Sequence, residues 1–437
     1  MIATVLVVVG LVLLAGLAAF AILAATRGTP VSEVVARGDG EPPPVGEPLF
    51  RRTLEAYVGT TMRPGHEIEI FDCGDATYPR FFADIRAARR FVAVQMYFAN
   101  PGRVADMLRD ALVDRARAGV ETLLLLDAFG SSLDEAWIES LKAAGVEVAK
   151  FRAFRPHMLH RMIHRAHVRA IVIDGEIGWT GGFGLDDQWL GDGRHKGSWR
   201  DTNARFTGPA VTRLLATFGS CWAEATGELI IGRRWWGEGT EETEEAAEGE
   251  DETPGALAAV LHAPPSAGST AAERLIALTV NGACKRLWIT NAYFVPDDDI
   301  RLFMKDAVRR GADVRVLCPG PNSDVRSTYL AARARYEELL GCGVRIWEYD
   351  PDMIHAKTMV VDGIWGMVGT MNLDNRSMAF NDECTLLAED AGVAARLEEL
   401  FLADLEHATE IELETFRKRP VWQKGLELAA HGMSRVL

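Results

Sequence analysis

The sequence predicts an α/β fold built from two similar lobes, each with a mixed β-sheet flanked by helices. The pattern H-x-(K or R)-x-x-x-x-D occurs at His167 and again at His355, and a glycine-rich turn starts fourteen residues after each histidine. Around these motifs, strand-like apolar runs alternate with helical stretches in the same order in both halves. The copies lie much farther apart than the units of a solenoid repeat, which indicates a duplicated domain.

Each half is expected to begin with a buried strand, a helix that ends at a glycine, and a second buried strand. A further helix and a short strand then lead to the motif. The elements expected in the first half are 91–98, 104–118, 120–127, 132–144 and 146–151. Those expected in the second half are 287–294, 300–310, 312–318, 327–340 and 344–349. This alternation predicts a largely parallel or mixed sheet in each lobe.

The chain begins with an apolar segment, from Met1 to Thr26, that contains no charged residue. A helix of ~25 residues is roughly 38 Å long, which is enough to cross a hydrocarbon core of ~30 Å with some tilt. Basic residues follow this segment and none precedes it, so the positive-inside rule places the body on the cytoplasmic side. We therefore expect one N-terminal transmembrane helix, with a cleaved signal peptide as the alternative.

Composition suggests the remaining boundaries. Residues 28–48 are rich in Pro, Gly and charge, and nine of the fifteen residues from Glu238 to Glu252 are acidic. Both stretches are typical of linkers. The predicted segments are an anchor at 1–27, a linker at 28–48, a first lobe at 49–232, an acidic and Pro/Gly-rich linker at 233–269, and a second lobe at 270–437.

The net charge and the spacing of the cysteines restrict the kinds of ligand that the protein is expected to bind. The formal net charge of −15 disfavours nucleic acid, because such binding depends on Lys and Arg neutralising phosphates. The six cysteines include no C-x-x-C pair, which indicates reduced thiols and gives no signal for a metal site.

His157, His160 and His164 precede the first motif without a carboxylate, so we expect surface or headgroup contacts there rather than a metal. Trp235 and Trp236 fit an interfacial anchor or ordinary packing equally well.

Each motif lies on a strand-like run, in which alternate side chains point to the same face. The histidine and the cation two residues later are therefore expected together at the end of a strand. The aspartate, seven residues after the histidine, is expected at the turn with the following glycine. The candidate catalytic residues are His167, Arg169, Asp174, His355, Lys357 and Asp362.

This combination of side chains suits a phosphodiester. The cations would bind the non-bridging oxygens and stabilise the charge of the transition state. One imidazole can attack phosphorus and form a phosphohistidine, while the other protonates the leaving alkoxide and then deprotonates the incoming hydroxyl. Asp201 and Glu383 each begin another strand-like run. A carboxylate at the far ring nitrogen fixes the tautomer of a histidine, so these two are the candidate orienting acids.

These motifs resemble those of the phospholipase D superfamily and, within it, the bacterial cardiolipin synthases. In the second half the match is carried by His355-Ala-Lys357 through Asp362-Gly363, Gly369-Thr-Met-Asn372-Leu-Asp374-Asn-Arg376-Ser377 and Asn381-Asp-Glu383. In the first half it is carried by Arg165-Ala-His167, Gly181-Gly182, Asp187, Trp199-Arg-Asp201-Thr and Gly208-Pro209-Ala210.

The resemblance implies two pseudo-twofold-related phospholipase D lobes and a phosphatidyl transfer through a phosphohistidine, with no metal and no cofactor. The usual reaction of the family joins two phosphatidylglycerols into cardiolipin and releases glycerol. The resemblance further implies that Thr370 and Asn372 bind phosphate, that the partners are phospholipid and membrane, and that the protein lies at the bacterial inner membrane. It leaves the oligomeric state open.

The first half departs from the family pattern. Arg169 stands in place of a lysine, Gly184 in place of an asparagine, and Gln188 and Trp189 in place of an acidic–aromatic pair. Because a guanidinium differs in shape from an ammonium group, we interpret the first copy as the weaker one. The alternatives are a phospholipase D that uses water as acceptor and a non-catalytic lipid-binding homologue. The sequence leaves open which histidine is the nucleophile.

Overall fold

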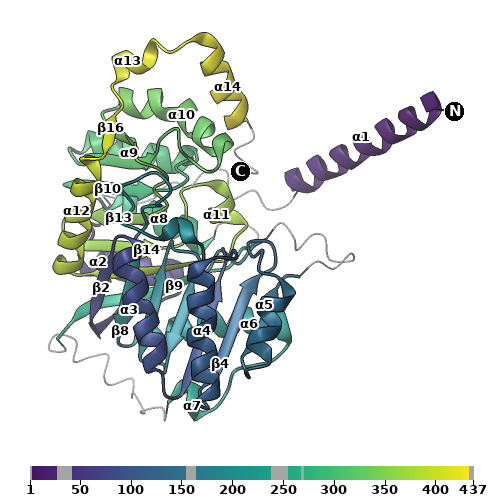
Figure 1. Cartoon of the computed structure of the whole chain (residues 1–437). Helices are drawn as coiled ribbons and strands as arrows, with labels where there is room; N and C mark the ends of the chain where they lie inside the picture. Colours follow the sequence, from purple (N-terminus) through teal and green to yellow (C-terminus); the bar gives the residue numbers. More distant parts are fainter. Residues whose placement is uncertain (1, 27–41, 154–163, 238–253, 267–269, 433–437) are drawn as a thin grey trace.

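The computed structural model describes residues 2–26, 42–153, 164–237, 254–266 and 270–432. The predicted acidic tract, most of the predicted 28–48 linker, His157 and His160 lie outside these residues. Two lobes stack along the long axis of the molecule, with most first-lobe elements in the lower half of Figure 1 and most second-lobe elements in the upper half.

The first lobe is built on a seven-stranded sheet. The strands in spatial order are β2 (Ile68–Phe71), β8 (Asn203–Thr207), β7 (Ile177–Gly181), β6 (Ala170–Ile173), β3 (Phe91–Met96), β4 (Glu121–Asp127) and β5 (Glu147–Phe151). β3, β4 and β5 pair in parallel, and the other neighbours pair antiparallel. The mixed sheet predicted from the alternation of elements is confirmed.

The second lobe repeats this arrangement in a nine-stranded sheet. Its strands in spatial order are β1 (Arg63–His66), β9 (Ala256–Ala263), β15 (Glu383–Glu389), β14 (Trp365–Gly369), β13 (Lys357–Val361), β10 (Arg286–Asn291), β11 (Asp313–Pro319), β12 (Arg345–Tyr349) and β16 (Ala408–Glu410). β10, β11 and β12 are parallel, and β13 runs antiparallel to β10. The two motif strands, β6 and β13, therefore hold equivalent central positions.

Helices cover both faces of each sheet. The outer face of the first sheet carries α3 (Gly74–Ala87), α4 (Arg103–Arg117) and α5 (Glu135–Lys142). The second carries α8 (Ala271–Asn281), α9 (Asp298–Arg309) and α10 (Arg326–Gly341). Between the sheets lie α6 (Ala210–Thr226) and α12 (Ala391–Leu405), in one apolar core that includes residues of both lobes. This shared core fixes the lobes against each other.

Several helices begin at an aspartate cap. The side chain accepts a hydrogen bond from the backbone amide three residues later, which satisfies one of the open donors of the first turn. The capping residues are Asp134 for α5, Asp297 for α9, Asp374 for α11 (Asn375–Ala379) and Asp390 for α12. Two of these helices were predicted: α5, expected at 132–144, begins at Glu135, and α9, expected at 300–310, begins at Asp298.

The structure places three elements differently from the predicted lobe boundaries. α2 (Pro48–Val58) was expected in the first lobe, but Phe50, Leu54 and Val58 pack in the core of the second lobe beside α8. β1, also expected in the first lobe, pairs with β9 of the second sheet. Part of the predicted 233–269 linker is in fact β9, because its run of small apolar residues pairs with β15 along its length. The stretch before the acidic tract forms α7 (Arg233–Trp236).

The remaining helices lie at the ends of the chain. In the described parts of the chain, no helix has both the length and the apolarity required to cross a membrane; α1 (Ile2–Thr26) precedes the lobes. The predicted anchor therefore stays a prediction.

At the other end of the chain, α13 (Leu413–Arg417) and α14 (Val421–His431) extend over α10. Trp235 of α7 is buried with its ring centroid 4.1 Å from that of Phe91, which is ordinary packing.

Candidate active site

The two motif histidines lie where the lobes meet, each just before a central strand. Isolated bridges join Ala166 to Asp382 and Arg200 to Ile354. The amide of His355 donates to the carbonyl of Arg200 at 2.7 Å. Each motif is thus held by backbone contacts to the segment that carries the orienting acid of the other lobe.

The orienting acids contact the histidines crosswise. His167 Nδ1 lies 3.0 Å from both carboxylate oxygens of Glu383, and His355 Nδ1 lies 2.9 Å from Asp201 Oδ2. These are the contacts expected of orienting acids, and that role for Asp201 and Glu383 stays a prediction. With Nδ1–H donated to a carboxylate, Nε2 of each imidazole carries the free lone pair and is the atom left to react.

Each carboxylate is itself held in place. Asp201 accepts from the indole Nε1 of Trp189 at 2.8 Å and from the amide of Thr202 at 2.7 Å. Its close approach requires glycine at position 182, where an added Cβ would lie 2.2 Å from Asp201 Oδ1. Glu383 accepts from the hydroxyl of Thr370 at 2.5 Å. Both acids are 1% exposed, so their positions are fixed by these donors rather than by water.

Aromatic rings line the imidazoles in a matched way. Tyr97 makes an edge contact with His167 at 4.9 Å between ring centroids, and Tyr293 makes one with His355 at 6.2 Å. Trp189 also contacts His355, at 5.4 Å. These contacts restrict rotation of the rings, and both histidines are buried.

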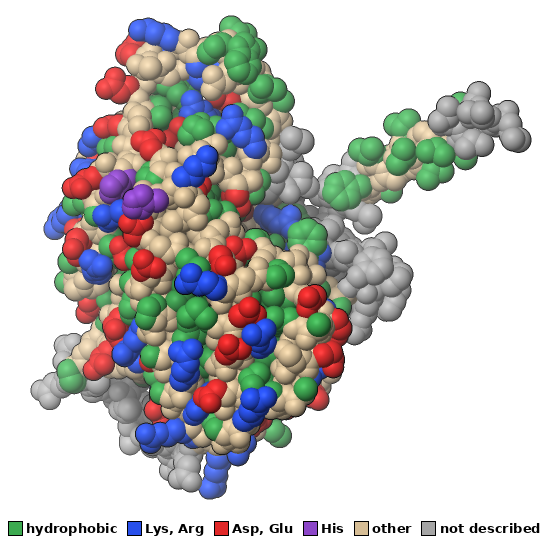
Figure 2. Space-filling model, in the orientation of Figure 1, with side chains coloured by type: hydrophobic (Ala, Val, Ile, Leu, Met, Phe, Trp, Pro, Cys, Tyr) green, Lys and Arg blue, Asp and Glu red, His purple; other side chains and the backbone are tan. Residues whose placement is uncertain are grey.

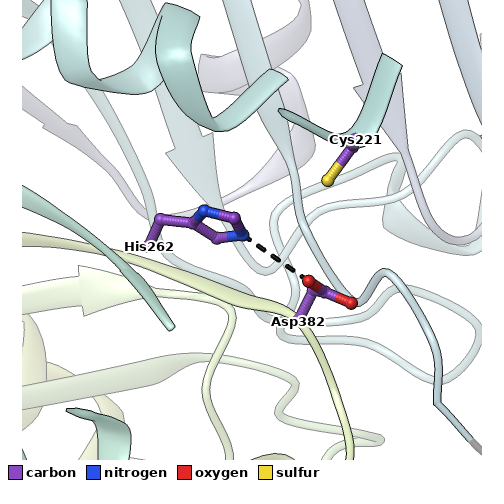
Figure 3. Close-up of side chains that lie close together, drawn as sticks. All are labelled: Cys221, His262 and Asp382. Atoms are coloured by element: carbon purple, nitrogen blue, oxygen red, sulfur yellow. Dashed lines mark ion pairs between the residues drawn. The ribbon is translucent and has the colours of Figure 1, made fainter. Parts of the chain in front are cut away.

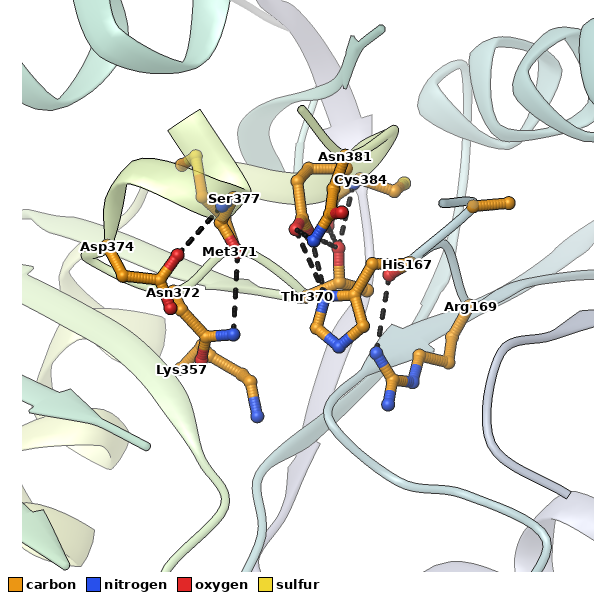
Figure 4. Close-up of polar contacts among 12 residues, drawn as sticks. His167, Arg169, Lys357, Thr370, Met371, Asn372, Asp374, Ser377, Asn381 and Cys384 are labelled. Carbon is orange, nitrogen blue, oxygen red and sulfur yellow. Dashed lines mark hydrogen bonds and ion pairs between the residues drawn. The ribbon is translucent and has the colours of Figure 1, made fainter. Parts of the chain in front are cut away.

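Arg169 and Lys357 extend toward the space beside the His167 ring from opposite lobes (Figure 4). The Nε of Arg169 donates to the carbonyl of Phe183 at 3.1 Å, and Lys357 Nζ donates to the carbonyl of His355. Both side chains are at least 96% buried. Two buried cations beside two imidazoles form a site for an anion, and its preorganised charge is worth most where water is excluded.

Burial and the cations together keep the imidazoles neutral. Burial, followed by the charge of Lys357, lowers the pKa of His355 to about 4. Burial, followed by Arg169 and Lys357, lowers the pKa of His167 well below its usual value. A phosphate bound between the cations would offset their effect and make a protonated imidazole less costly.

The two acids differ in charge state. Burial alone would raise the pKa of Asp201, but the hydrogen bond and charge of His355 and the charge of Lys357 lower it overall. Burial raises the pKa of Glu383 to about 7, despite the hydrogen bond from Thr370. Burial also lowers the pKa of Lys357 to about 7. The His355–Asp201 pair is therefore the one whose carboxylate stays ionised at neutral pH.

The structure corrects the grouping of Asp174 and Asp362 with the catalytic residues. Both lie at the predicted turns, at the far end of the motif strand from the histidine, with φ of 55° and 53°. Asp174 accepts backbone amides of residues 89–91 at 2.7 to 3.0 Å, and Asp362 does the same for residues 284–286 at 2.7 to 2.9 Å. These carboxylates fix the start of β3 and β10 and do not reach the imidazoles.

Thr370 also has another role than predicted. Its hydroxyl donates to Glu383 and accepts from the amide of Cys384 at 2.9 Å, so it supports an orienting acid instead of facing a phosphate. Asn372 fits the predicted role better: it is 3% exposed, and its amide nitrogen lies 3.4 Å from Ser377 Oγ. Within the described residues its Oδ1 has no partner. Phosphate binding by Asn372 stays a prediction.

Trp189, which from the sequence is only a departure from the family pattern, contacts both Asp201 and His355. Its ring fills the space beside Gly184, where an added Cβ would lie 2.7 Å from the indole. The two departures from the family pattern, Gly184 and Trp189, are therefore linked: the indole of Trp189 occupies the space that a side chain at position 184 would need. The signal in the sequence that could have pointed to this contact is a tryptophan, Trp189, twelve residues before the candidate orienting acid Asp201.

Two further places in the described residues carry side chains of the types that bind metal ions: His164, and a cluster of one cysteine, one histidine and one aspartate. His164 Nδ1 lies 2.9 Å from the carbonyl of Phe380. In the described parts of the chain, one group has metal-ligand spacing: the ligand atoms of Cys221, His262 and Asp382 lie within 4.8 Å of one another (Figure 3). The guanidinium of Arg152 lies 3.1 Å from Asp382 and already balances its charge, which makes this group a poor cation site.

Comparison with known proteins agrees with this geometry. Residues 276–405 match the family model described as "Cardiolipin synthase, PLD-like domain". The cardiolipin synthase of Geobacillus kaustophilus is 33% identical over 349 residues, which are 79% of this chain and 68% of the relative. Cardiolipin synthase A of Pseudomonas aeruginosa is 32% identical over 386 residues, 86% of this chain and 75% of the relative. The chain belongs to the cardiolipin synthase family of phospholipase D-like proteins.

A solved structure supports the fold of this cardiolipin synthase family member. Phosphatidylserine synthase of Haemophilus influenzae superposes with a TM-score of 0.67, covering 89% of this chain and all of that one. The two sequences are only 12% identical, so the likeness shows the fold alone. The resemblance to the phospholipase D superfamily, read from the paired motifs, is confirmed.

Proposed function

We propose that this chain is a phosphatidyltransferase that joins two phosphatidylglycerols into cardiolipin and releases glycerol, through a phosphohistidine intermediate. The observation that carries the proposal is the crosswise arrangement of two imidazoles, each held at Nδ1 by a carboxylate of the other lobe, beside two buried cations. The names of the relatives support the same substrate class.

The proposed reaction has two displacements at phosphorus. Arg169 and Lys357 bind the non-bridging oxygens of the donor phosphodiester. Nε2 of one histidine attacks phosphorus, while the other histidine, protonated in the complex, gives its proton to the departing glycerol oxygen. The hydroxyl of the acceptor lipid then loses its proton to that same histidine and attacks phosphorus, which breaks the P–N bond and frees the nucleophile.

The asymmetry of the acids bears on which histidine does which task. An ionised Asp201 stabilises a positive charge on His355, which suits a group that must accept and return a proton. We therefore assign the acid–base role to His355 and the nucleophilic role to His167. Trapping the phosphorylated intermediate with labelled substrate and mapping the modified residue tests this assignment. A phosphate on His355 would reverse it.

We also propose that the protein is a membrane protein, held by a single N-terminal span with its body on the cytoplasmic side. The support is the uncharged segment from Met1 to Thr26 and the basic residues that follow it. Fractionation of cells expressing the full chain, with alkaline extraction of the membranes, tests the anchor. Release of the protein by alkali would contradict it.

The test of the reaction is product analysis. Full-length protein with labelled phosphatidylglycerol should give cardiolipin and glycerol in equal amounts. Free phosphatidic acid without cardiolipin would instead identify a hydrolase. No turnover by the parent, together with activity in Arg169→Lys, would identify a lipid-binding homologue that has lost catalysis.

A further inference from the structure

The segment that leads into the first motif is strongly basic. From Arg152 to Ile173 the sequence has five arginines and four histidines and no acidic residue, in a chain whose formal net charge is −15. Arg169, at the end of this segment, belongs to the proposed transfer site. Arg165 precedes His167 by two residues and has no part in the reaction described above. Its environment indicates a second anion site.

The guanidinium of Arg165 is buried without a counter-ion. The residue is 4% exposed and stacks on the ring of Phe129 at 4.6 Å. Its Nε has no hydrogen-bond partner, and Arg165 forms no side-chain ion pair among the described residues. The undescribed stretch 154–163 contains no Asp or Glu in its sequence, so it cannot supply a carboxylate.

Asp127 is the acidic group whose charge acts on Arg165, and its two oxygens already accept three backbone amides. They accept the backbone amides of Phe129, Gly130 and Ala166 at 2.9 to 3.2 Å. A buried cation that lacks a partner of its own carries a large desolvation cost. An anionic ligand with strong acceptor oxygens would offset that cost.

A second arginine, Arg376, lies close by in the fold: the amide of Asp382 donates to the carbonyl of Arg165 at 2.8 Å, and the amide of the preceding Asn381 donates to the carbonyl of Arg376 at 3.0 Å. Arg376 lies on α11, partly exposed, and among the described residues its side chain has no ion pair. It is close enough to Arg165 and to His167 for its charge to lower the pKa of both groups. Two neighbouring guanidinium groups repel each other unless an anion lies between them, and both are well suited to a phosphate.

The spacing to the transfer site fits a second phosphate of the same product. Arg165, His167 and Arg169 occupy alternate positions in the segment that leads into β6, and two residues of an extended chain advance ~6.6 Å. The two phosphates of cardiolipin are separated by a single glycerol bridge, a span of the same order. We propose that Arg165 and Arg376 bind the phosphate of the acceptor phosphatidylglycerol while its glycerol hydroxyl reaches the phosphohistidine.

This inference rests on the proposed function and adds to it the recognition of the acceptor. Water and simple alcohols carry no phosphate, so they gain nothing from the subsite. The subsite would therefore favour cardiolipin formation over hydrolysis without taking part in either displacement. Arg165 and Arg376 are specificity-determining residues in this scheme, and Arg169 and Lys357 bind the donor.

The experiment compares two acceptors in the full-length enzyme. Arg165→Gln and Arg376→Gln are assayed for cardiolipin from phosphatidylglycerol alone and for phosphatidylethanol in the presence of ethanol. We expect cardiolipin formation to fall at least about tenfold, through a higher KM for the acceptor, because each change removes a charge-assisted contact to phosphate. Transfer to ethanol should change less than about threefold. Arg165→Lys should recover part of the loss.

The controls separate the possible failures. Arg109→Gln, an exposed arginine on α4 that pairs with Asp106, should leave both products unchanged. Arg376 is partly exposed, so its variant gives a result even where the buried Arg165 variant is unstable. Equal losses with both acceptors, or no loss, would overturn the subsite. A parent enzyme that transfers to ethanol or water but makes no cardiolipin would instead overturn the proposed function, and the subsite with it.

An independent observation concerns α14. Its exposed side chains are all apolar: Val421 is 85% exposed, Trp422 69%, Leu426 52% and Leu428 66%. Gly425 and Ala429 complete this face, which shows as hydrophobic surface at the upper right of the molecule (Figure 2). The opposite side, with Glu427 and Ala430, is buried against α10.

We infer that this face of α14 inserts into the lipid interface of the bilayer that holds the substrate. Trp and aliphatic residues on one side of a short helix are typical of interfacial helices, and the neighbouring Lys418 and Lys424 complement anionic lipid. Glu427 pairs with Arg333 and Arg419 with Glu337, so α14 runs antiparallel to α10. Its C-terminal end therefore points toward the start of α10, beside the loop whose Asp324 accepts a hydrogen bond from Tyr293 of the active site.

The test compares substrate forms in the full-length enzyme. Trp422→Asp and Leu426→Asp should reduce turnover of phosphatidylglycerol in vesicles about tenfold, because each places a charge in the interface. Turnover of a short-chain, water-soluble phosphatidylglycerol should not change. Leu402→Asp, an exposed leucine on α12, is the matched control. Equal effects on both substrate forms, or conversion of an oligomer to monomers by light scattering, would overturn the membrane assignment.

Discussion

Replacing Asp201 with asparagine keeps the size of the side chain but removes the negative charge that faces His355. The carboxylate accepts from His355 Nδ1 and Trp189 Nε1 on one oxygen and from the amide of Thr202 on the other. An asparagine has one accepting oxygen and one donating nitrogen. In either orientation its amide hydrogens meet an N–H group, so His355 is driven to the other tautomer or one donor is left without an acceptor.

The magnitude follows from these contacts. Loss of a charge-assisted hydrogen bond costs about 1.5–3 kcal/mol, which alone is roughly a ten- to hundredfold loss of rate. The wrong tautomer adds to this, because Nε2 then carries a proton and cannot accept one. The corresponding Asp→Asn change in a Ser-His-Asp triad lowers kcat by about ten thousandfold. We expect about a thousandfold loss of kcat for cardiolipin formation, equivalent to ~4 kcal/mol.

The assay is steady-state formation of labelled cardiolipin by the full-length enzyme, with thermal unfolding measured in parallel. Asp84→Asn is the matched control, because Asp84 is buried and also accepts an indole N–H, from Trp179 at 3.0 Å, while lying outside the site. It should lower the unfolding temperature and leave kcat within about threefold. A folded Asp201→Asn enzyme within tenfold of the parent would refute the view that this carboxylate fixes the tautomer of His355.

Three further changes test separate parts of the site. Asp362→Asn should lower the free energy of unfolding by about 1–3 kcal/mol, by thermal denaturation, with kcat little changed, because its carboxylate accepts backbone amides only; a large loss of kcat in stable protein would restore it to the catalytic group. Lys357→Arg should move the alkaline limb of the kcat/KM–pH profile upward from about pH 7, since the lysine loses its charge as pH rises through its pKa of about 7 and arginine does not; an unmoved limb would assign it to another group. Trp189→Phe should reduce kcat about five- to tenfold through the lost hydrogen bond to Asp201, with KM unchanged; a purely structural role would instead appear as reduced thermal stability at normal kcat.

The sequence predicted the local part of the site well. Strand periodicity predicts each histidine and its cation on one face, and the charges of Arg169 and Lys357 do act on both imidazoles. The assignment of Asp174 as catalytic was wrong, and the same periodicity shows why. Seven residues of extended chain span ~23 Å, so this carboxylate cannot reach the histidine of its own motif.

Contacts between the lobes could not be read from the sequence. Glu383 lies 28 positions after His355 but faces His167, which is 216 residues away. Such a pairing depends on the packing of α6 and α12 between the sheets, which no local pattern encodes. The pairing of β1 with β9 in one sheet could not be predicted for the same reason, since it joins segments that lie before and after the first lobe in the sequence.

The crosswise pairing changes the meaning of the departures in the first half. Read along the sequence, Gly184 and Trp189 weaken the first motif. In the structure, the indole of Trp189 holds Asp201, and Asp201 orients His355 of the second lobe. The exchange thus supports the histidine of the other lobe, and it leaves the acid partner of His167 untouched. Because each half supplies the acid that contacts the other half's histidine, neither copy of the motif can be judged intact or degraded alone.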